Sequence, residues 1–364
     1  MAKHSYCITI NRIPASRDPI EYKFRQTKCT LNCAKDAACV RFEMGSKRTH
    51  EDVIAFRVDL AKDAMRKMYL LHALRYDSRL RVRSITVTID GESKIYEQGY
   101  PGFPFLYSML TARELGLPEG WHDREFLNAV LTATKSKSVS DPRYACLFSF
   151  LAGTGRVYES EKFTCYWTAV NGHYNHLMDC YIARLFEKKG VSSMAELPKA
   201  DRFKTGDRTS LGALVRILGC GQTVAGNGDR TTFKSEYGAV KSHLRGYDRQ
   251  QLQELYAQLS AHRRDLGWVP EGPLGEHLAL CMERTGLSAW AFLLFDYGYY
   301  IRCNYLHGSK TPVLFAAATD PELAAFRALN IFLGEYLKEA IPGMFREDWF
   351  TEEMFEKIRE GIKL

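Results

Sequence analysis

Two different rhythms of hydrophobic and polar residues follow each other along the chain. Near the N-terminus, residues 5–10 and 86–89 are rich in β-branched and aromatic residues, and Asp90-Gly91 follows the second run as a hairpin turn would. Between these predicted strands, residues 51–74 carry apolar side chains at helical spacing, and Thr49 stands where an N-cap is expected. This combination predicts an α+β unit in the first hundred residues.

From about Tyr144 onward the apolar positions follow a helical rhythm. Residues 163–185 repeat apolar side chains every three or four positions, and this predicted helix stops at Gly190. A second helix is expected from Ser288 to His307, with Gly308 at its end, and a third after Asp320-Pro321. Helices that are apolar along one side must pack against each other, so the C-terminal part is predicted to be an all-α bundle.

The length of the chain and its breaker-rich segments predict two domains. The chain has 364 residues, more than twice the usual length of one domain. Residues 100–104 and 136–142 are rich in residues that interrupt regular structure, and the boundary should fall between them. We expect an α+β domain over residues 1–140 and a helical domain over residues 141–364.

The positive charge of the chain is concentrated in the predicted N-terminal domain. The whole chain carries a net charge of +7; residues 1–140 hold 23 Lys and Arg against 16 Asp and Glu, and the remainder holds 27 of each. A basic half beside a neutral half is typical of a domain that binds a polyanion such as RNA. The alternative interpretation is that the basic surface serves solubility alone.

Composition excludes several classes of protein and site. No stretch approaches the long uncharged apolar run of a membrane span, and the N-terminus does not resemble a signal peptide, so we expect a cytoplasmic protein without membrane contact. The ten cysteines are scattered as free thiols would be. Cys29, Cys33 and Cys39 do not follow the paired spacing of zinc sites, so no metal and no other cofactor is predicted.

The chemistry of the chain is expected at the end of the second predicted helix. Arg302, Asn304 and His307 stand on the last turn and a half of an otherwise apolar helix. A His can move a proton near neutral pH, and an Arg can donate hydrogen bonds to a phosphorane. This pair suits attack of a ribose 2′-hydroxyl on the adjacent phosphate, which leaves a 2′,3′-cyclic phosphate and a 5′-hydroxyl without a metal.

Spacing alone does not distinguish this pair from others in the chain. Arg66 and His72, on the predicted N-terminal helix, are separated by a similar interval. We interpret them as a solvated helix face, because no apolar dimer surface accompanies them. His173 and His176 are three residues apart, but no third ligand joins them, and His176 is interpreted as a histidine satisfied within the bundle. The segment from Gly219 to Gly228 is glycine-rich without a nucleotide-binding pattern, and is expected to be a loop.

The run from Tyr300 to Gly308 resembles the signature of the HEPN superfamily, in which an Arg and a His separated by four to six residues lie on a late helix. The segment 163–171, Phe-Thr-Cys-Tyr-Trp-Thr-Ala-Val-Asn, resembles the aromatic first core helix of the same fold, especially in its Apea-like branch. The resemblance covers about Tyr144 to Ile362. One departure is Cys303, because Asn, Asp or His is frequent after the Arg and here the amide follows one step later at Asn304.

The resemblance implies a four- or five-helix bundle that dimerises, so that two copies of the motif form one ribonuclease site. Members of the superfamily commonly serve as toxins, abortive-infection effectors or RNA-targeting nucleases. The sequence therefore predicts a metal-independent endoribonuclease with Arg302 and His307 as catalytic residues, Asn304 in support, and RNA and a second copy as partners. The N-terminal domain would capture RNA or bind a trigger or antitoxin. The alternatives are a non-catalytic HEPN dimer that binds RNA or serves as a scaffold, and a regulatory partner of a toxin or nucleotidyltransferase.

Overall fold

The computed structural model divides the chain into two compact units, Met1–Tyr144 and Ala145–Leu364. It describes residues 3–15, 19–24, 26–55, 57–75, 80–98, 117, 121, 126–127, 129–130, 141–222, 234–306 and 320–362. The two units are called the sheet unit and the helical unit below, and each is described by itself.

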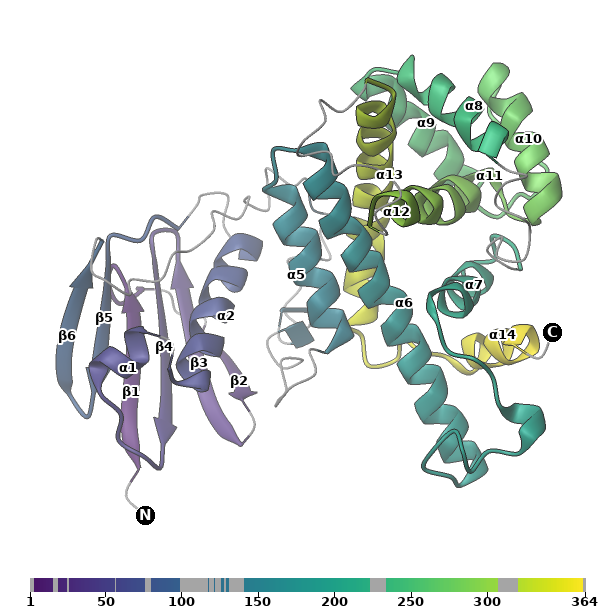
Figure 1. The fold of residues 1–364 in the computed structure, drawn as a ribbon. Helices are drawn as coiled ribbons and strands as arrows, with labels where there is room; N and C mark the ends of the chain where they lie inside the picture. Colours follow the sequence, from purple (N-terminus) through teal and green to yellow (C-terminus); the bar gives the residue numbers. More distant parts are fainter. Residues whose placement is uncertain are drawn as a thin grey trace. The chain divides into compact units, whose positions relative to one another are not determined.

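The sheet unit is built on one antiparallel sheet of six strands in the order β2-β3-β4-β1-β5-β6 (Figure 1). The predicted strands at residues 5–10 and 86–89 are confirmed within β1 and β5, which are neighbours and pair antiparallel from Tyr6–Ile89 to Ile10–Ile85. The strands are β1 (His4–Ile10), β2 (Ile20–Phe24), β3 (Thr27–Ala34), β4 (Ala37–Met44), β5 (Ser84–Ile89) and β6 (Glu92–Glu97).

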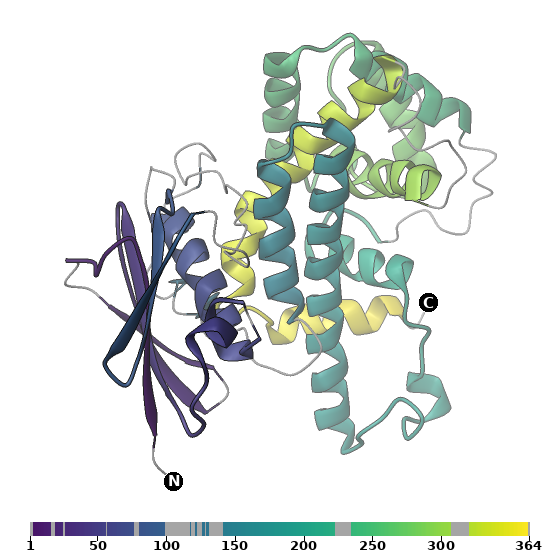
Figure 2. The ribbon, with the colours of Figure 1, turned by 60° about the vertical axis from the view of Figure 1, so that its left-hand side comes forward.

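The two faces of this sheet differ because side chains alternate along each strand. On β1, Tyr6, Ile8 and Ile10 are buried, and their cross-strand partners on β4 include Phe42 and Val40. Helices α1 (His50–Ile54) and α2 (Asp59–Arg75) lie on the same side of the sheet, with α2 against β3 and β4 and α1 against β5 (Figure 2). The opposite face, called the outer face below, carries mostly small and polar side chains, among them Cys7, Thr30, Arg41, Thr86 and Thr88.

Local signals in the sheet unit are confirmed at two points and wrong at a third. Asp90 and Gly91 have positive φ angles of 50° and 90°, as a two-residue hairpin requires, and the Thr49 side chain accepts a hydrogen bond from the Asp52 amide. The single helix expected over residues 51–74 is instead two helices, because the chain leaves the helical conformation at Ala55 and restarts at Asp59. The break lets α1 and α2 contact different strands of the sheet.

The helical unit follows the predicted all-α pattern. Its long central helix, α6 (Glu159–Lys189), ends at Gly190, which adopts the left-handed conformation with φ of 64°, as predicted. It packs against α13 (Asp320–Met344), which begins at the predicted Asp320-Pro321. The other helices are α5 (Pro142–Thr154), η2 (Lys199–Asp201), α7 (Asp207–Ile217), α8 (Lys234–Arg245), α9 (Arg249–Ala261), α10 (Pro273–Thr285), α11 (Ala289–Ala291), α12 (Gly298–Leu306) and α14 (Glu352–Ile362).

Aromatic side chains fill the interior of the helical unit. Phe163 on α6 contacts Phe326 on α13 with ring centroids 5.3 Å apart, and Trp167 and Trp290 are almost completely buried. Burial of large aromatic side chains is the main source of cohesion between helices packed this way. None of the helices in the described ranges combines the length and the apolar character that crossing a bilayer requires.

Candidate functional site

The predicted motif lies on a helix with an irregular middle. The Ser288 hydroxyl caps the helix by accepting a hydrogen bond from the Ala291 amide at 3.2 Å, and α11 then continues into a π-helical segment, Phe292–Tyr297, before α12. All six residues of the π-helical segment are buried, including Asp296, which accepts a hydrogen bond from the Tyr237 hydroxyl at 2.5 Å. Single π-helical turns within α-helices are frequent at functional sites because they shift the register of the residues that follow.

Arg302 lies on α12, five residues after this segment, and its side chain is 16% exposed. One of its terminal nitrogens, Nη2, is 3.3 Å from Oδ2 of Asp207, the first residue of α7. Its guanidinium also lies over the ring of Tyr299, with 5.7 Å between the central carbon and the ring centroid. The structure therefore holds the predicted catalytic arginine in an ion pair within its own chain.

Two side chains of α6 complete this polar cluster. The Tyr174 hydroxyl donates a hydrogen bond to Oδ1 of Asn171 at 2.6 Å. Burial, together with the neighbouring negative charge of Asp207, raises the pKa of Tyr174, so its hydroxyl stays protonated and serves as a donor. The Arg302 cluster, consisting of Asn171, Tyr174, Asp207 and Arg302, thus combines side chains of α6, α7 and α12.

Sequence reasoning identified Arg302 but missed Asp207 and Tyr174 as members of its site. Asp207 follows Gly206 at the start of a helix, where an acidic residue is favoured by the helix dipole alone, so its sequence context indicates no second role. Tyr174 belongs to the aromatic pattern of α6 and is predicted only as a core residue. The fold brings both to Arg302.

The other predicted site residues differ in how far they are placed. Asn304 lies on α12 and is partly buried. Cys303 has its sulfur 3.9 Å from the Nη1 of Arg302, within reach of a weak hydrogen bond. His307 and Gly308 lie outside the described residues. The predicted pairing of Arg302 with His307 therefore stays a prediction.

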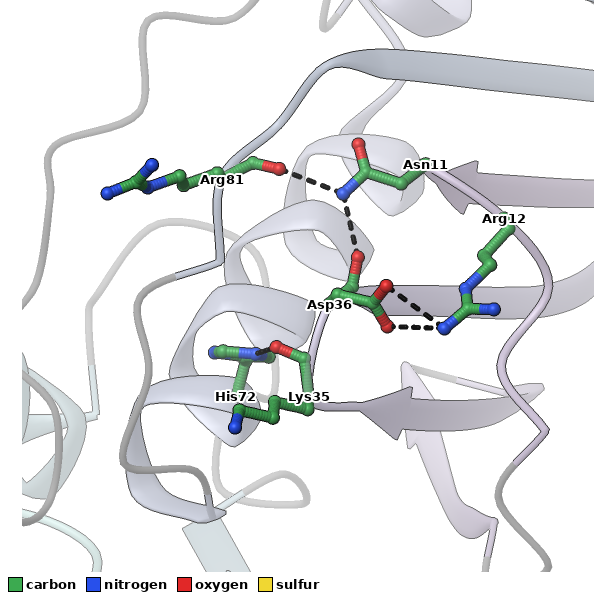
Figure 3. A network of polar contacts seen from close by, with 6 residues as sticks. All are labelled: Asn11, Arg12, Lys35, Asp36, His72 and Arg81. Atoms are coloured by element: carbon green, nitrogen blue, oxygen red, sulfur yellow. Dashed lines mark hydrogen bonds and ion pairs between the residues drawn. The ribbon is translucent and has the colours of Figure 1, made fainter.

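The interpretation of Arg66 and His72 as a solvated helix face is wrong for His72. His72 is buried at 2% exposure, and its Nε2 lies 2.9 Å from the carbonyl oxygen of Lys35 (Figure 3). Burial lowers the pKa of His72, which favours its neutral form. This histidine faces inward because α2 packs along the sheet, and it joins the helix to the β3–β4 turn. The side chain of Arg66 lies outside the described part of the chain.

The histidines of α6 are part of the helix packing. His173 is buried, and its Nδ1 lies 2.7 Å from the Tyr336 hydroxyl. Burial first, and the nearby His176 second, lower the pKa of His173 to about 3, so its ring is neutral and shares this hydrogen bond with Tyr336. His176 is half-buried and stacks on Trp349 with ring centroids 4.9 Å apart. Among the residues that the structure describes, no three potential ligands are grouped as a metal site.

Comparison of the chain with protein-family models, with curated proteins and with solved structures finds no match in any of the three.

Proposed function

We propose that the protein is a metal-independent endoribonuclease of HEPN type, with Arg302 and His307 as its catalytic residues. The observation that supports this most directly is the place of Arg302, partly buried on a late helix of an all-α unit and surrounded by polar groups from two further helices. An arginine in an apolar bundle is costly unless its charge has a partner or a function.

In the proposed reaction, His307 removes the proton of the ribose 2′-hydroxyl, and the resulting oxygen attacks the adjacent phosphorus. Arg302 donates hydrogen bonds to the phosphorane as negative charge develops. The bond to the 5′-oxygen breaks, and that oxygen takes up a proton, which leaves a 2′,3′-cyclic phosphate and a 5′-hydroxyl. A base and an acid are both required, so a second copy of the chain would supply the second histidine in a two-fold symmetric dimer.

The Arg302–Asp207 ion pair gives this site a resting state. A phosphate that binds Arg302 must compete with the carboxylate of Asp207, which is 3.3 Å away. Asn304 would then support the position of the phosphate or of the helix end. A toxin or antiviral effector requires an activity that is inhibited until substrate or a trigger binds, and such an ion pair fits this requirement. The sheet unit would bind the RNA, the trigger or an antitoxin.

The same ion pair also favours a second candidate function, a HEPN dimer that binds RNA or serves as a scaffold without cutting. In that case Arg302 would be a structural cation that joins α12 to α7, and its removal would destabilise the unit without affecting any cleavage.

The experiment is cleavage of total RNA by the purified full-length chain, compared with Arg302→Ala and His307→Ala. Loss of a proton-transfer group costs about two to four decades in rate, and loss of a donor to developing charge costs about two to three. Arg346→Ala is the matched control, because Arg346 is 71% exposed and pairs with Asp348. We expect cleavage with 2′,3′-cyclic phosphate ends that EDTA does not affect. Equal activity of all variants would contradict the catalytic assignment.

A further inference from the structure

A groove in the sheet unit has no role in the site described above. It has a volume of about 1090 Å³ and lies where β1 begins and β4 ends, bounded by the β2–β3 turn, the β4–α1 connection and the start of α2. Pockets for small molecules usually have about 300–1000 Å³, so this groove is large enough for more than one nucleotide.

Positive charge dominates the lining of the groove. Five cationic side chains line it against two carboxylates, Glu43 and Asp59, which leaves an excess of three positive charges; the cations are Lys3, Lys28, Arg41, Arg48 and Arg57. The sheet unit as a whole carries the excess positive charge of the chain. The groove is therefore where part of that charge is gathered on a concave surface, and concave charged surfaces concentrate ions of the opposite sign.

The cations differ in how far they are already neutralised. Lys28 pairs with Glu21 at 2.8 Å, Lys3 with Glu43 at 3.5 Å and Arg57 with Asp52 at 3.4 Å. All three cations are more than 60% exposed, and such exposed pairs contribute little and exchange readily for a phosphate. Arg41 and Arg48 are exposed too, and among the described residues no carboxylate lies within ion-pair distance of either. Arg41 lies beside the Cys7 thiol, whose pKa it helps to lower, but neither arginine is neutralised by a carboxylate, so these two are the principal anion-binding groups of the groove.

The uncharged part of the lining also suits a phosphate backbone better than a protein surface. Hydroxyl groups of Ser5, Thr27, Thr30 and Ser46 line the groove and can donate hydrogen bonds to phosphate oxygens. Of the large apolar residues in the lining, Phe42, Val58 and Leu60 are buried, with Phe42 stacked on Tyr6. Phe24 and Met44 are partly exposed, and an exposed aromatic ring beside phosphate-binding groups suits the stacking of a base.

We propose that this groove binds the phosphate backbone of single-stranded RNA, with Arg41 and Arg48 as its principal contacts. The choice of RNA as the polyanion rests on the proposed function, whereas the excess positive charge of the groove does not. Arginine fits this role because its planar guanidinium donates two parallel hydrogen bonds to a phosphate.

The test is binding of a fluorescein-labelled 12-nucleotide oligouridine to the full-length chain, measured by fluorescence anisotropy over a range of salt concentrations. The protein carries His307→Ala, so that RNA is not cut during the measurement. The variant is Arg41→Ala with Arg48→Ala, and the matched control is Lys62→Ala with Arg81→Ala, two exposed cations that do not line the groove. Folding should be kept, because Arg48 contributes to the core only its backbone amide, which donates to the Tyr6 hydroxyl at 2.8 Å.

We expect the groove variant to bind at least tenfold more weakly, because hydrogen bonds to charged groups contribute roughly a factor of ten or more each. The slope of log affinity against log salt should flatten by about 0.7 for each lost phosphate contact. The control should bind as the parent protein does. Equal losses in the groove variant and the control would overturn the proposal, as would tight binding of a labelled oligoglutamate peptide with no binding of RNA.

The experiments distinguish a groove that does not bind RNA from a protein that is not a ribonuclease. RNA cleavage is measured in parallel with His307 intact. Binding that depends on Arg41 and Arg48, without any cleavage, keeps the groove and rejects the ribonuclease. Cleavage and binding that are both unchanged in the groove variant reject the groove and keep the ribonuclease.

Discussion

His173 makes the stability of the helical unit depend on pH in a way that can be calculated. The residue is 4% exposed, and its ring shares a hydrogen bond with the Tyr336 hydroxyl. Burial lowers the pKa of His173 from 6.5 to about 3 in the folded state. At any pH between these two values, His173 is therefore mostly protonated in the unfolded chain and mostly neutral in the folded chain.

The sign and size of the effect follow from proton linkage. Because the folded pKa is depressed, the contribution of His173 to stability is complete above pH 6.5 and is lost as the pH falls toward 3. The slope is about 1.4 kcal/mol per pH unit in the middle of this range, and between pH 7 and pH 4 the loss amounts to about 3 kcal/mol. That is a substantial part of the total stability of a typical domain.

The assay is urea unfolding of the full-length chain at several pH values, followed by tryptophan fluorescence. Trp349 is a suitable reporter, because its ring lies 5.6 Å from the ring of His173. His173→Gln can still form a hydrogen bond with Tyr336 but cannot be protonated. In acid, unfolding of this variant should therefore take up about one proton fewer than unfolding of the parent, and its free energy of unfolding should fall less steeply as the pH decreases. His262→Gln is the control, since His262 is exposed and stacks on Trp268. The same acid dependence in the parent and in His173→Gln would refute the reasoning.

Two ion pairs and the oligomeric state of the chain can be tested as well. Asp207→Asn should raise kcat/KM for RNA cleavage by about fivefold or more, because the Asp207 carboxylate would no longer compete with phosphate for Arg302. A fivefold change corresponds to about 1 kcal/mol, since about 1.4 kcal/mol is a factor of ten. A decrease of kcat/KM in steady-state assays would make Asp207 a positioning residue instead. In the sheet unit, the Lys67 side chain is completely buried, with its Nζ 2.9 Å from Oδ2 of Asp63. Asp63→Asn leaves this buried charge unpaired and should lower the free energy of unfolding by about 3–5 kcal/mol, whereas the double variant with Lys67→Met removes the charge and should recover most of the loss. Additive losses of the two substitutions in urea unfolding would contradict this. The full-length chain should be a dimer in light scattering at micromolar concentration, and a stable monomer would count against the shared active site.

Enrichment in β-branched and aromatic residues identified β1 and β5 but not β2, β3, β4 and β6. In β3, Cys29, Leu31 and Cys33 are buried at every second position, which is the signature of a half-buried strand. The residues between them are the polar Thr30 and Asn32. The strand is hard to recognise from the sequence because two of its three buried positions are cysteines, which are also potential metal ligands. Their spacing of four is even, and this places Cys29 and Cys33 on the same face of the sheet, against α2.

The spacing of apolar residues does not predict where a helix breaks or becomes π-helical. The break after Ile54 and the π-helical segment at Phe292–Tyr297 both occur within runs whose apolar spacing fits one continuous helix. A pattern of apolar residues records which side of a helix is buried, but it does not record where packing shifts the register by a residue. The long helix α6 shows the converse case, because an uninterrupted pattern and a glycine stop predicted its end at Gly190.

The candidate site was predicted in part for the same reason. Arg302 is proposed from the sequence because it stands with Asn304 and His307 at the end of an otherwise apolar helix and because this run resembles a known motif, and both signals lie within one element. Asp207 and Tyr174 are ordinary in their own helices, as a first-turn acid and a core aromatic residue. Their importance comes from the packing of α6 and α7 around α12, which no local pattern contains.

Under the two proposals above, affinity for RNA would come from the sheet unit and chemistry from the helical unit, and the distribution of charge makes this separation testable. Arg302 is held by Asp207, so its first encounter with a phosphate gains little net attraction, whereas Arg41 and Arg48 in the groove are exposed and can bind a phosphate directly. Counterion release makes binding to such exposed cations sensitive to salt, while the partly buried Arg302 is screened much less. Salt should therefore raise KM for RNA cleavage steeply and leave kcat almost unchanged. A parallel fall of kcat in steady-state kinetics would place the salt-sensitive contacts at Arg302 itself.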